Sequence, residues 1–272
     1  MRSEDEIRTL VRERYGAIVR DGESCCAPAS CGCGAEMAPD GLNMIGDAYS
    51  GVAGHLAEAD FDLGCGVPTR HAALAAGETV LDLGSGAGND VFIARHEVGP
   101  KGRVIGVDMT PEMIVKARAN ASKLGYDNVE FRLGEIEQMP IEAGSVDVVI
   151  SNCVLNLVPD KTSAFAEMFR VLRPGGRFCV SDIVATGELP GPVQDAAGLY
   201  VGCVAGAMPE ADYLALLSGV GFERVHVAEA KSVAIPDDAL APHMDAAELA
   251  AFRGSGIVLK SLTVLGFKPA AN

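Results

Sequence analysis

Short apolar runs alternate with helical runs between residues 79 and 182, and this alternation constrains the fold more than any other feature. The short runs are rich in β-branched residues, and the runs between them repeat apolar residues at helical spacing. The expected strands are 79–83, 103–107, 129–133, 146–151 and 177–182, and the expected helices are 90–96, 111–124 and 161–171. Apolar strands joined by helices form a parallel sheet that is covered on both faces. The sequence therefore predicts an α/β fold with a doubly wound sheet.

The segment before this alternation is different in character. Residues 3–20 predict an amphipathic helix, and Ser3 and Glu6 form a capping box at its start. Residues 22–46 are rich in Gly, Cys, Ala and Pro and show neither period, so they predict a loop. We therefore interpret residues 1–46 as an N-terminal helix followed by a cysteine-rich arm.

The segment after residue 183 completes the sheet in our interpretation. A turn at 173–176 (RPGG) leads into the fifth strand. Further on we expect a helix within 208–222 and two strands within 225–235 and 256–267, which form an antiparallel end of the same sheet. The expected parts are thus 1–46, a central α/β domain at 47–183, and a smaller C-terminal α+β region at 184–272.

Charge and cysteine content narrow the class of function. The chain has 22 basic and 37 acidic side chains, a formal charge of −15, which disfavours nucleic acid and anionic membranes as partners. No run of 18 uncharged apolar residues appears, and the N-terminus lacks the apolar centre of a signal peptide. We expect a cytoplasmic protein whose eight cysteines are mostly reduced thiols.

A glycine-rich turn follows the first expected strand in VLDLGSGAGND, residues 80–90. Asp82 ends the strand, and Gly84, Gly86 and Gly88 allow a ligand to approach the backbone closely. The spacing is G-x-G-x-G, which differs from the G-x-G-x-x-G fingerprint of dinucleotide sites. The turn predicts a nucleotide-like ligand without a pyrophosphate group.

The next three strands end in residues that suit the same ligand. Asp108, in GVDMT, lies 20 residues after Gly88 and can accept hydrogen bonds from ribose hydroxyls, although it could also cap the following helix. Met109 can cover one face of an adenine, and Glu135, in FRLGEIE, can reach its amino group. The fourth strand ends in SNCVLNL, which contains Asn152. All these residues fall on the carboxyl edge, where doubly wound sheets bind ligands.

The run from residue 79 to residue 182 resembles the class I methyltransferases. The motifs DLGSGAGND, GVDMT, LGEIE, SNCVLNL and LRPGG stand in the order typical of that family. The resemblance implies a Rossmann-like methyltransferase domain and S-adenosylmethionine as its cofactor.

Three cysteines are expected near the acceptor side of this site. Cys65 lies between two glycines in DLGCGVP, Cys153 follows the fourth strand, and Cys203 lies in the small-residue segment LYVGCVAGAM. Cys179, inside the fifth strand, is interpreted as core. Three thiolates favour a soft centre and would hold a pyramidal As(III) at Cys65, Cys153 and Cys203. Zinc is the rival, but structural zinc prefers four ligands in local pairs.

The arm contains a second group of cysteines, Cys25, Cys26, Cys31 and Cys33. Their spacing suits metalloid capture, disulfide exchange or an accident of composition. We favour capture or redox participation for Cys25 or Cys26, and Cys31 and Cys33 are left without a role. None of the five histidines is assigned one.

Nearly the whole chain, from about residue 10 to residue 269, resembles the arsenite methyltransferases. The shared motifs are SCC, AYS, DLGCGVPT, DLGSGAGND, GVDMTPEM, SNCVLNLVPDK and SLTVLGFKP, and SNCVLNLVPDK is the most diagnostic. The resemblance implies that Cys25 or Cys26, Cys65, Cys153 and Cys203 bind arsenic or cycle through a disulfide, and that Tyr49 lies near the cofactor. Arsenite or its thiol conjugate is the expected substrate, and thioredoxin or glutathione the expected reductant.

Two other functions fit parts of the pattern. A class I methyltransferase acting on an organic small molecule would make the cysteines incidental. A non-catalytic thiol protein that binds a metalloid or metal would keep the fold without turnover. The intact nucleotide-site motifs argue against the second of these.

Overall fold

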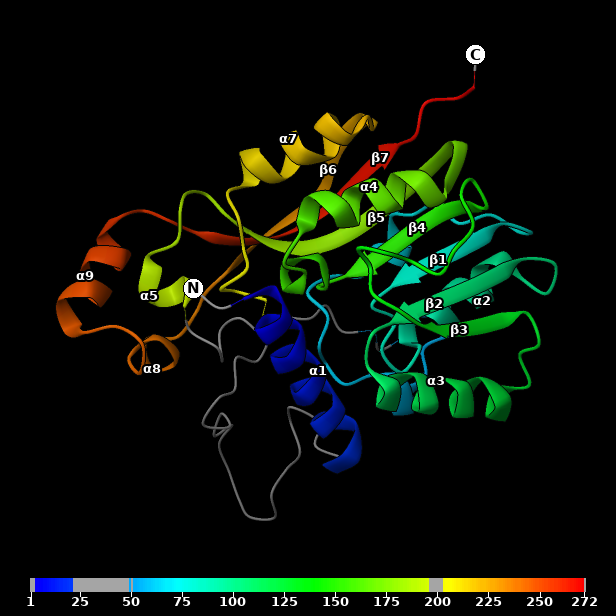
Figure 1. The fold of residues 1–272 in the computed structure, drawn as a ribbon, viewed down its shortest axis with the longest axis horizontal. Coiled ribbons are helices and arrows are strands. Elements are labelled where there is room, and N and C mark those ends of the chain that lie inside the picture. Colours follow the sequence, from blue (N-terminus) through cyan, green and yellow to red (C-terminus); the bar gives the residue numbers. More distant parts are fainter. Residues whose placement is uncertain (1–2, 22–48, 50, 196–202, 272) are drawn as a thin grey trace.

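The computed structural model describes residues 3–21, 49, 51–195 and 203–271 of the chain. Within these ranges seven strands form one sheet in the order β3-β2-β1-β4-β5-β7-β6. The strands are β1 (Thr79–Leu83), β2 (Arg103–Asp108), β3 (Val129–Leu133), β4 (Val146–Asn152), β5 (Leu172–Ala185), β6 (Glu223–Val233) and β7 (Leu259–Phe267). Strands β1 to β5 are parallel, and β7 pairs antiparallel with both β5 and β6. The structure confirms the predicted α/β sheet and its antiparallel end (Figure 1).

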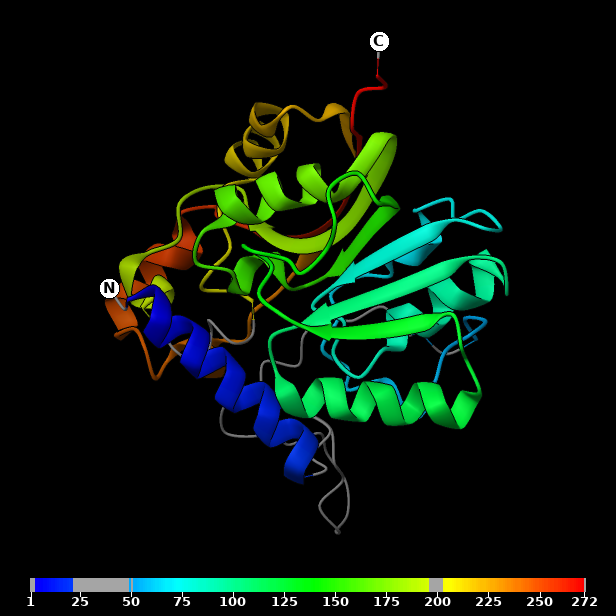
Figure 2. The same ribbon diagram turned by 45° about the vertical axis from the view of Figure 1, so that its right-hand side comes forward.

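Helices cover both faces of the sheet because successive strand residues point to opposite sides. Val80 of β1 packs in a cluster with α2 (Asn89–Val98) and α3 (Pro111–Leu124), whereas its neighbour Leu81 packs with α4 (Lys161–Val171) and α7 (Glu210–Val220). Helix α1 (Glu4–Asp21) lies against α3, as Figure 2 shows. The central strands β1, β2, β4 and most of β5 are therefore buried on both faces, which explains their nearly continuous apolar sequences.

Shorter helices complete the described chain. The one-turn helices are η1 (Ala57–Ala59), η2 (Pro68–Arg70) and η3 (Leu155–Leu157). Helices α5 (Gly191–Gln194), α8 (Asp237–Leu240) and α9 (Ala246–Gly254) gather at one end of the molecule, beyond β7 in Figure 1. No helix in the described part of the chain is long and apolar enough to cross a membrane.

The predicted capping box of α1 is present. The main-chain N–H of Ser3 donates to Glu6 Oε2 at 2.7 Å, and the N–H of Glu6 donates to Ser3 Oγ at 3.3 Å. These two bonds satisfy donors that the first turn of a helix leaves free. The sequence signal at Ser3 therefore marks the helix start correctly.

The expected turn at 173–176 is instead an excursion inside a longer strand. Strand β5 begins at Leu172, which pairs with Val146, and pairing resumes with Arg177 opposite Val148. The four residues between them bulge outward opposite Asp147, with Gly175 at φ 77°. Arg173 forms an ion pair with Asp147. This pairing on either side of the glycines extends the strand beyond the predicted range.

Strand β5 also crosses the predicted boundary at residue 183, and β6 and β7 join the same sheet. The division of the chain at residues 46 and 183 stays a prediction. The carboxyl ends of β1, β2 and β4 meet where the strand order reverses between β1 and β4. Doubly wound folds bind ligands at such a point.

Candidate active site

A pocket opens at the carboxyl ends of β1, β2 and β4. It encloses about 1060 Å³ when the space at its open mouth is included. Its lining includes eight of the residues singled out from the sequence: Tyr49, Asp82, Gly84, Gly86, Asp108, Met109, Asn152 and Cys153. The structure thus brings most of the predicted set to one cavity.

The glycine-rich turn forms one wall of this pocket. Gly84 has φ 66°, and a Cβ at this position would lie 2.4 Å from Val154 Cγ2. Gly86 has φ 51°, and its main-chain N–H donates to Asp108 Oδ2 at 2.9 Å. The turn therefore needs glycine both for its left-handed backbone and for its close approach to the segment after β4.

Two buried carboxylates and one partly buried carboxylate face the pocket from separate elements. The buried Asp82 is the second-last residue of β1, the buried Asp90 lies in the first turn of α2, and the partly buried Asp108 ends β2. Burial raises the pKa of Asp90 to about 6, and burial together with the charges of Asp90 and Asp108 raises the pKa of Asp82 well above its ordinary value. Burial also raises the pKa of Asp108, which main-chain N–H groups partly offset. This concentration of acids favours a ligand with positive charge.

Tyr49 and Asn152 connect Asp90 to the loop that carries Cys65. The hydroxyl of Tyr49 donates to Asp90 Oδ2 at 2.8 Å, and Asn152 Nδ2 donates to the carbonyl of Gly66 at 2.7 Å. The main-chain N–H of Cys65 donates in turn to Asn152 Oδ1 at 3.0 Å. One asparagine therefore fixes the loop before the sheet to the end of β4.

Two buried side-chain oxygens of the pocket have no hydrogen-bond partner within the described structure. They are Asp90 Oδ1 and Ser85 Oγ. An unsatisfied buried oxygen is costly, so these atoms indicate a ligand that supplies hydrogen-bond donors. S-adenosylmethionine carries an ammonium, a sulfonium and ribose hydroxyls, and it fits a cavity with this acidic lining.

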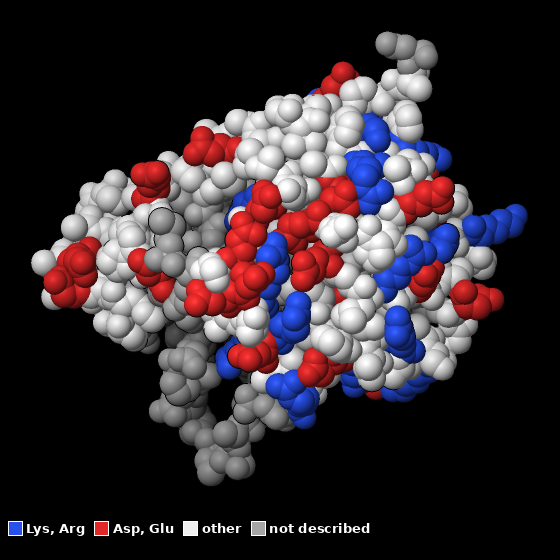
Figure 3. Space-filling model, in the orientation of Figure 1, with Lys and Arg blue, Asp and Glu red and all other residues white. Residues whose placement is uncertain are grey.

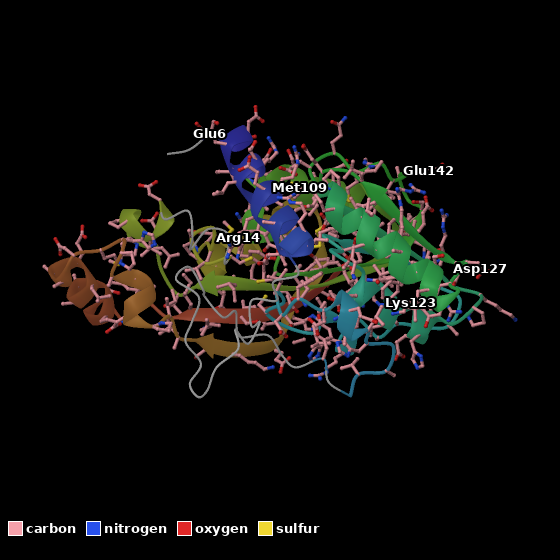
Figure 4. The ribbon with its side chains drawn as sticks, turned by 90° about the horizontal axis from the view of Figure 1, so that it is seen from below. Glu6, Arg14, Met109, Lys123, Asp127 and Glu142 are labelled. Atoms are coloured by element: carbon pink, nitrogen blue, oxygen red, sulfur yellow. The ribbon has the colours of Figure 1, made fainter. Side chains whose placement is uncertain are left out.

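Helix α1 forms the outer wall of the pocket. Arg8, Val11 and Tyr15 line it, and Met109 packs in the same apolar cluster as Val11. Figure 4 shows Met109 beside this helix. Arg8 binds Glu137 at 2.9 Å, and on the face drawn in Figure 3 the described acidic and basic side chains lie side by side around α1. The helix is held over the site by apolar packing and ion pairs together.

Glu135 does not lie where the sequence pattern placed it. Its carboxylate binds Arg8 Nε at 3.7 Å and Arg12 at 3.5 Å, and it is absent from the pocket lining. The residues on either side of it, Gly134, Ile136 and Glu137, line the cavity instead. The structure therefore turns Glu135 towards α1, a helix whose position the sequence did not reveal.

The three predicted cysteines meet in one apolar cluster. Cys65, Cys153 and Cys203 are free thiols with exposed fractions of 1%, 2% and 1%. Cys153 also lines the pocket, whereas Cys65 and Cys203 lie outside its lining. Cys179 is buried in a different cluster, which confirms its interpretation as a core residue. The thiol cluster and the pocket therefore adjoin each other at Cys153.

Two of these cysteines have left-handed backbones. Cys153 has φ 58° and Cys203 has φ 61°, values that are uncommon for residues other than glycine. The thiol of Cys203 donates to the carbonyl of Cys153 at 2.7 Å. Such strained positions persist only where surrounding contacts hold them, and they gather at functional sites.

The thiols of Cys65 and Cys153 are protonated, and the three cysteines are not arranged around a central atom. Burial raises the pKa of Cys65 and of Cys153, so both keep their protons near neutrality. In the described ranges no group of three or more His, Cys, Asp or Glu side chains is arranged to hold a metal ion. A captured atom would therefore require the thiols to turn and lose their protons.

Sequence reasoning missed Asp90 and Ser85, although both lie within the quoted motif DLGSGAGND. An acid in the first turn of a helix is usually interpreted as a favourable charge at the helix N-terminus. The signal that could have identified Asp90 is its position in a buried helix: its neighbours Asn89, Val91 and Phe92 are also buried, so Asp90 has no side that faces solvent. Cys25, Cys26, Cys31 and Cys33 lie outside the described residues.

The chain is similar in sequence and structure to known methyltransferases. Residues 74–232 match a family model described as a methyltransferase domain. An arsenic(III) S-adenosylmethionine methyltransferase from Chlamydomonas reinhardtii has a similar structure, with a TM-score of 0.65 and 38% identity over 76% of this chain and 68% of that one. The chain belongs to the arsenite methyltransferase family of class I methyltransferases. This confirms the predicted resemblance and the predicted fold class.

Curated members of the arsenite methyltransferase family agree with this assignment. An arsenite methyltransferase of Halobacterium salinarum is 50% identical over 84% of the chain, and one of Mus musculus is 33% identical over 81%. The chain covers 60% and 59% of the lengths of these two relatives. It therefore spans about three fifths of the length of these two relatives.

Proposed function

We propose that the protein transfers methyl groups from S-adenosylmethionine to As(III) bound by Cys65, Cys153 and Cys203. The observation that carries this proposal is the cluster of three buried, free thiols that adjoins the acidic pocket at Cys153. Soft thiolates prefer thiophilic centres, and the pocket suits a cationic methyl donor. Family membership and the shared cysteine motifs support the same acceptor.

The pocket residues have distinct roles in this proposal. S-adenosylmethionine supplies an electrophilic methyl group on a sulfonium sulfur. Asp108 accepts hydrogen bonds from the ribose hydroxyls. Gly84 and Gly86 allow the backbone to approach the ligand closely. Asp82 and Asp90 balance the positive charge, and Tyr49 and Asn152 hold Asp90 in place. Met109 and Ile136 supply apolar contact for the adenine, a role that Glu135 does not share in this arrangement.

Capture of arsenic does not require ionised thiols beforehand. Each thiol forms one As–S bond, and its proton leaves with one hydroxyl of As(OH)₃ as water. A thiol conjugate would exchange in the same way and release its own thiol. The buried, protonated state of Cys65 and Cys153 suits this condensation because no charge is created in an apolar cluster.

Methyl transfer then needs orientation more than a general base. The lone pair of the three-coordinate arsenic attacks the methyl carbon as the C–S bond breaks, which oxidises arsenic to the pentavalent state. A second transfer to the same atom needs two electrons, and thiols can supply them by forming a disulfide. We assign this supply to a thiol reductant, thioredoxin or glutathione, with Cys25 or Cys26 as the exchanging cysteine. A cytoplasmic location fits this need for reduced thiols.

Arsenic speciation by chromatography with elemental detection tests the proposal. Protein incubated with arsenite, S-adenosylmethionine and a thiol reductant is expected to yield methylated arsenic. The Cys153→Ser variant is expected to yield none while it still binds S-adenosylhomocysteine. Absence of methylated arsenic from wild-type protein with demonstrated cofactor binding would refute the arsenic acceptor and favour an organic one.

A further inference from the structure

Asn156 lies directly behind the thiol cluster and connects the segments that carry two of the cysteines. Its side chain is 0% exposed. Asn156 Nδ2 donates to the carbonyl of Ile183 on β5 at 2.5 Å and to the carbonyl of Cys203 at 3.1 Å. Asn156, three residues after Cys153 in the chain, therefore connects Cys203 to the central sheet through one amide group.

The backbone of Asn156 is held as firmly as its side chain. Lys161 Nζ donates to the carbonyls of Asn156 and Val158 at 3.4 and 3.3 Å, and the main-chain N–H of Asn156 donates to the buried carboxylate of Asp182. A Cβ on Gly206 would lie 2.0 Å from the carbonyl oxygen of Asn156. The segment after Cys203 therefore approaches Asn156 more closely than a side chain would allow.

These contacts explain how the left-handed backbones of Cys153 and Cys203 persist. Cys203 is fixed through its carbonyl, which accepts from Asn156, and through its thiol, which donates to the carbonyl of Cys153. The main-chain N–H of Cys153 donates to the carbonyl of Ser181 on β5 at 2.7 Å. Both cysteines are therefore aligned to the same strand, with Asn156 as the connecting group for Cys203.

We propose that Asn156 is a positioning residue that sets the place of the Cys203 thiol for the arsenic site. It touches no substrate, and it acts through the backbone of Cys203. This inference rests on the proposed function, because the affected step is capture of the trivalent centre. Partners of this kind behind metal ligands typically change affinity by about 10- to 100-fold when they are removed.

The test compares Asn156→Ala with Asn128→Ala. Asn128 Nδ2 also donates to two main-chain carbonyls, those of Gly99 and Gly102 at 3.1 and 2.8 Å, but at the opposite edge of the sheet. Both variants are expected to lower thermal stability. Only Asn156→Ala is expected to raise the KM for arsenite and the Kd for arsenite, by about tenfold or more, while the Kd for S-adenosylhomocysteine stays unchanged.

The rate at which N-ethylmaleimide labels Cys203 reports how firmly Asn156 holds Cys203, independently of the methylation reaction. In cofactor-free protein this rate is expected to rise in Asn156→Ala and to stay at the wild-type value in Asn128→Ala, with Cys179 as internal reference. Gly206→Ala, which forces the segment away from Asn156, is expected to reproduce the effect, and it decides the question if Asn156→Ala does not fold.

Two results lead to different conclusions. Unchanged labelling of Cys203 and unchanged arsenite affinity in a folded variant overturn the positioning role. If wild-type protein neither binds nor methylates arsenite, the proposed function fails. The labelling rates still decide whether Asn156 holds Cys203.

Discussion

At the scale of single residues, Asp90 combines burial, a raised pKa and an unpaired oxygen. Its Oδ2 is held by Tyr49 and Asn152, whereas Oδ1 has no partner among the described groups. A carboxylate in this state is poised to pair with a cation that enters the pocket. Asp90 is therefore the residue whose ionisation should govern cofactor binding most directly.

Cofactor affinity is expected to fall as the pH drops below about 6. The pKa of Asp90 is raised to about 6 by burial, so the acid is neutral below that pH and loses its attraction for a cation. The Kd for S-adenosylmethionine should rise by up to about tenfold per pH unit there, and calorimetry measures it. Asp90→Asn should bind about tenfold more weakly at pH 7.5 and lose this dependence. An identical pH profile in the variant would assign the effect to another group.

At the scale of elements, α1 connects the N-terminal part of the chain to the cofactor pocket. Its apolar side packs in the cluster of the thiols, and its basic side binds Glu135 and Glu137. A helix that walls a pocket in this way helps to enclose the ligand. The ion pairs of Arg8 should therefore influence how tightly the cofactor is retained.

Arg8→Ala is expected to raise the KM for S-adenosylmethionine by about three- to tenfold, because the pair with Glu137 is largely buried and contributes about 1 kcal/mol. Steady-state kinetics measure this KM. The difference in KM between wild-type protein and the variant should shrink at high salt, because salt screens the ion pair. The matched control is Arg20→Ala, which removes the ion pair of α1 with Glu112, since Arg20 does not line the pocket. Equal effects of the two variants would show that only the stability of α1 matters.

The elements also show how far sequence reasoning extends. The predicted bounds of β1, β3, α3 and α4 agree with the structure because their signals are local: apolar runs, a proline at a helix start and a glycine after its end. Strand β5 was predicted too short, since its first residue is fixed by pairing with Val146 across the bulge. The rotation of Glu135 towards α1 depends on a contact 127 residues away (135 minus 8), which no local pattern contains.

The candidate site divides in the same way. Cys65, Cys153 and Cys203 were predicted from motifs, and the structure brings them into one cluster. The left-handed backbones of Cys153 and Cys203 and the hydrogen bonds of Asn156 were not predicted, because both depend on β5, which is distant in the sequence. Asp90 was hidden within a recognised motif because its exposure is decided by the whole fold.

At the scale of the whole molecule, buried acids make stability depend on pH. Asp182 is 1% exposed, and burial raises its pKa to about 7 from an ordinary value of 3.8. A carboxyl with a raised folded-state pKa favours the folded state while it is protonated. That contribution is present below about pH 4 and is lost as the pH rises to about 7. Asp90 acts in the same direction.

Cofactor-free protein is therefore expected to unfold at a lower temperature at pH 8 than at pH 5.5. Thermal unfolding followed by circular dichroism measures this difference. Asp182→Asn should reduce the difference, since an amide keeps the volume and the acceptor oxygen without a charge to bury. A variant with the same pH dependence as wild-type protein would exclude Asp182 as its source.

The central claim is that three cysteines from separate parts of the fold bind one trivalent arsenic. Arsenic K-edge X-ray absorption of the arsenite complex counts the sulfur neighbours of the arsenic directly. The account predicts three sulfur neighbours in wild-type protein and in Cys179→Ser, and one fewer in each of Cys65→Ser, Cys153→Ser and Cys203→Ser. An oxygen-dominated shell in wild-type protein, or an undiminished sulfur count in any of these three variants, would contradict it.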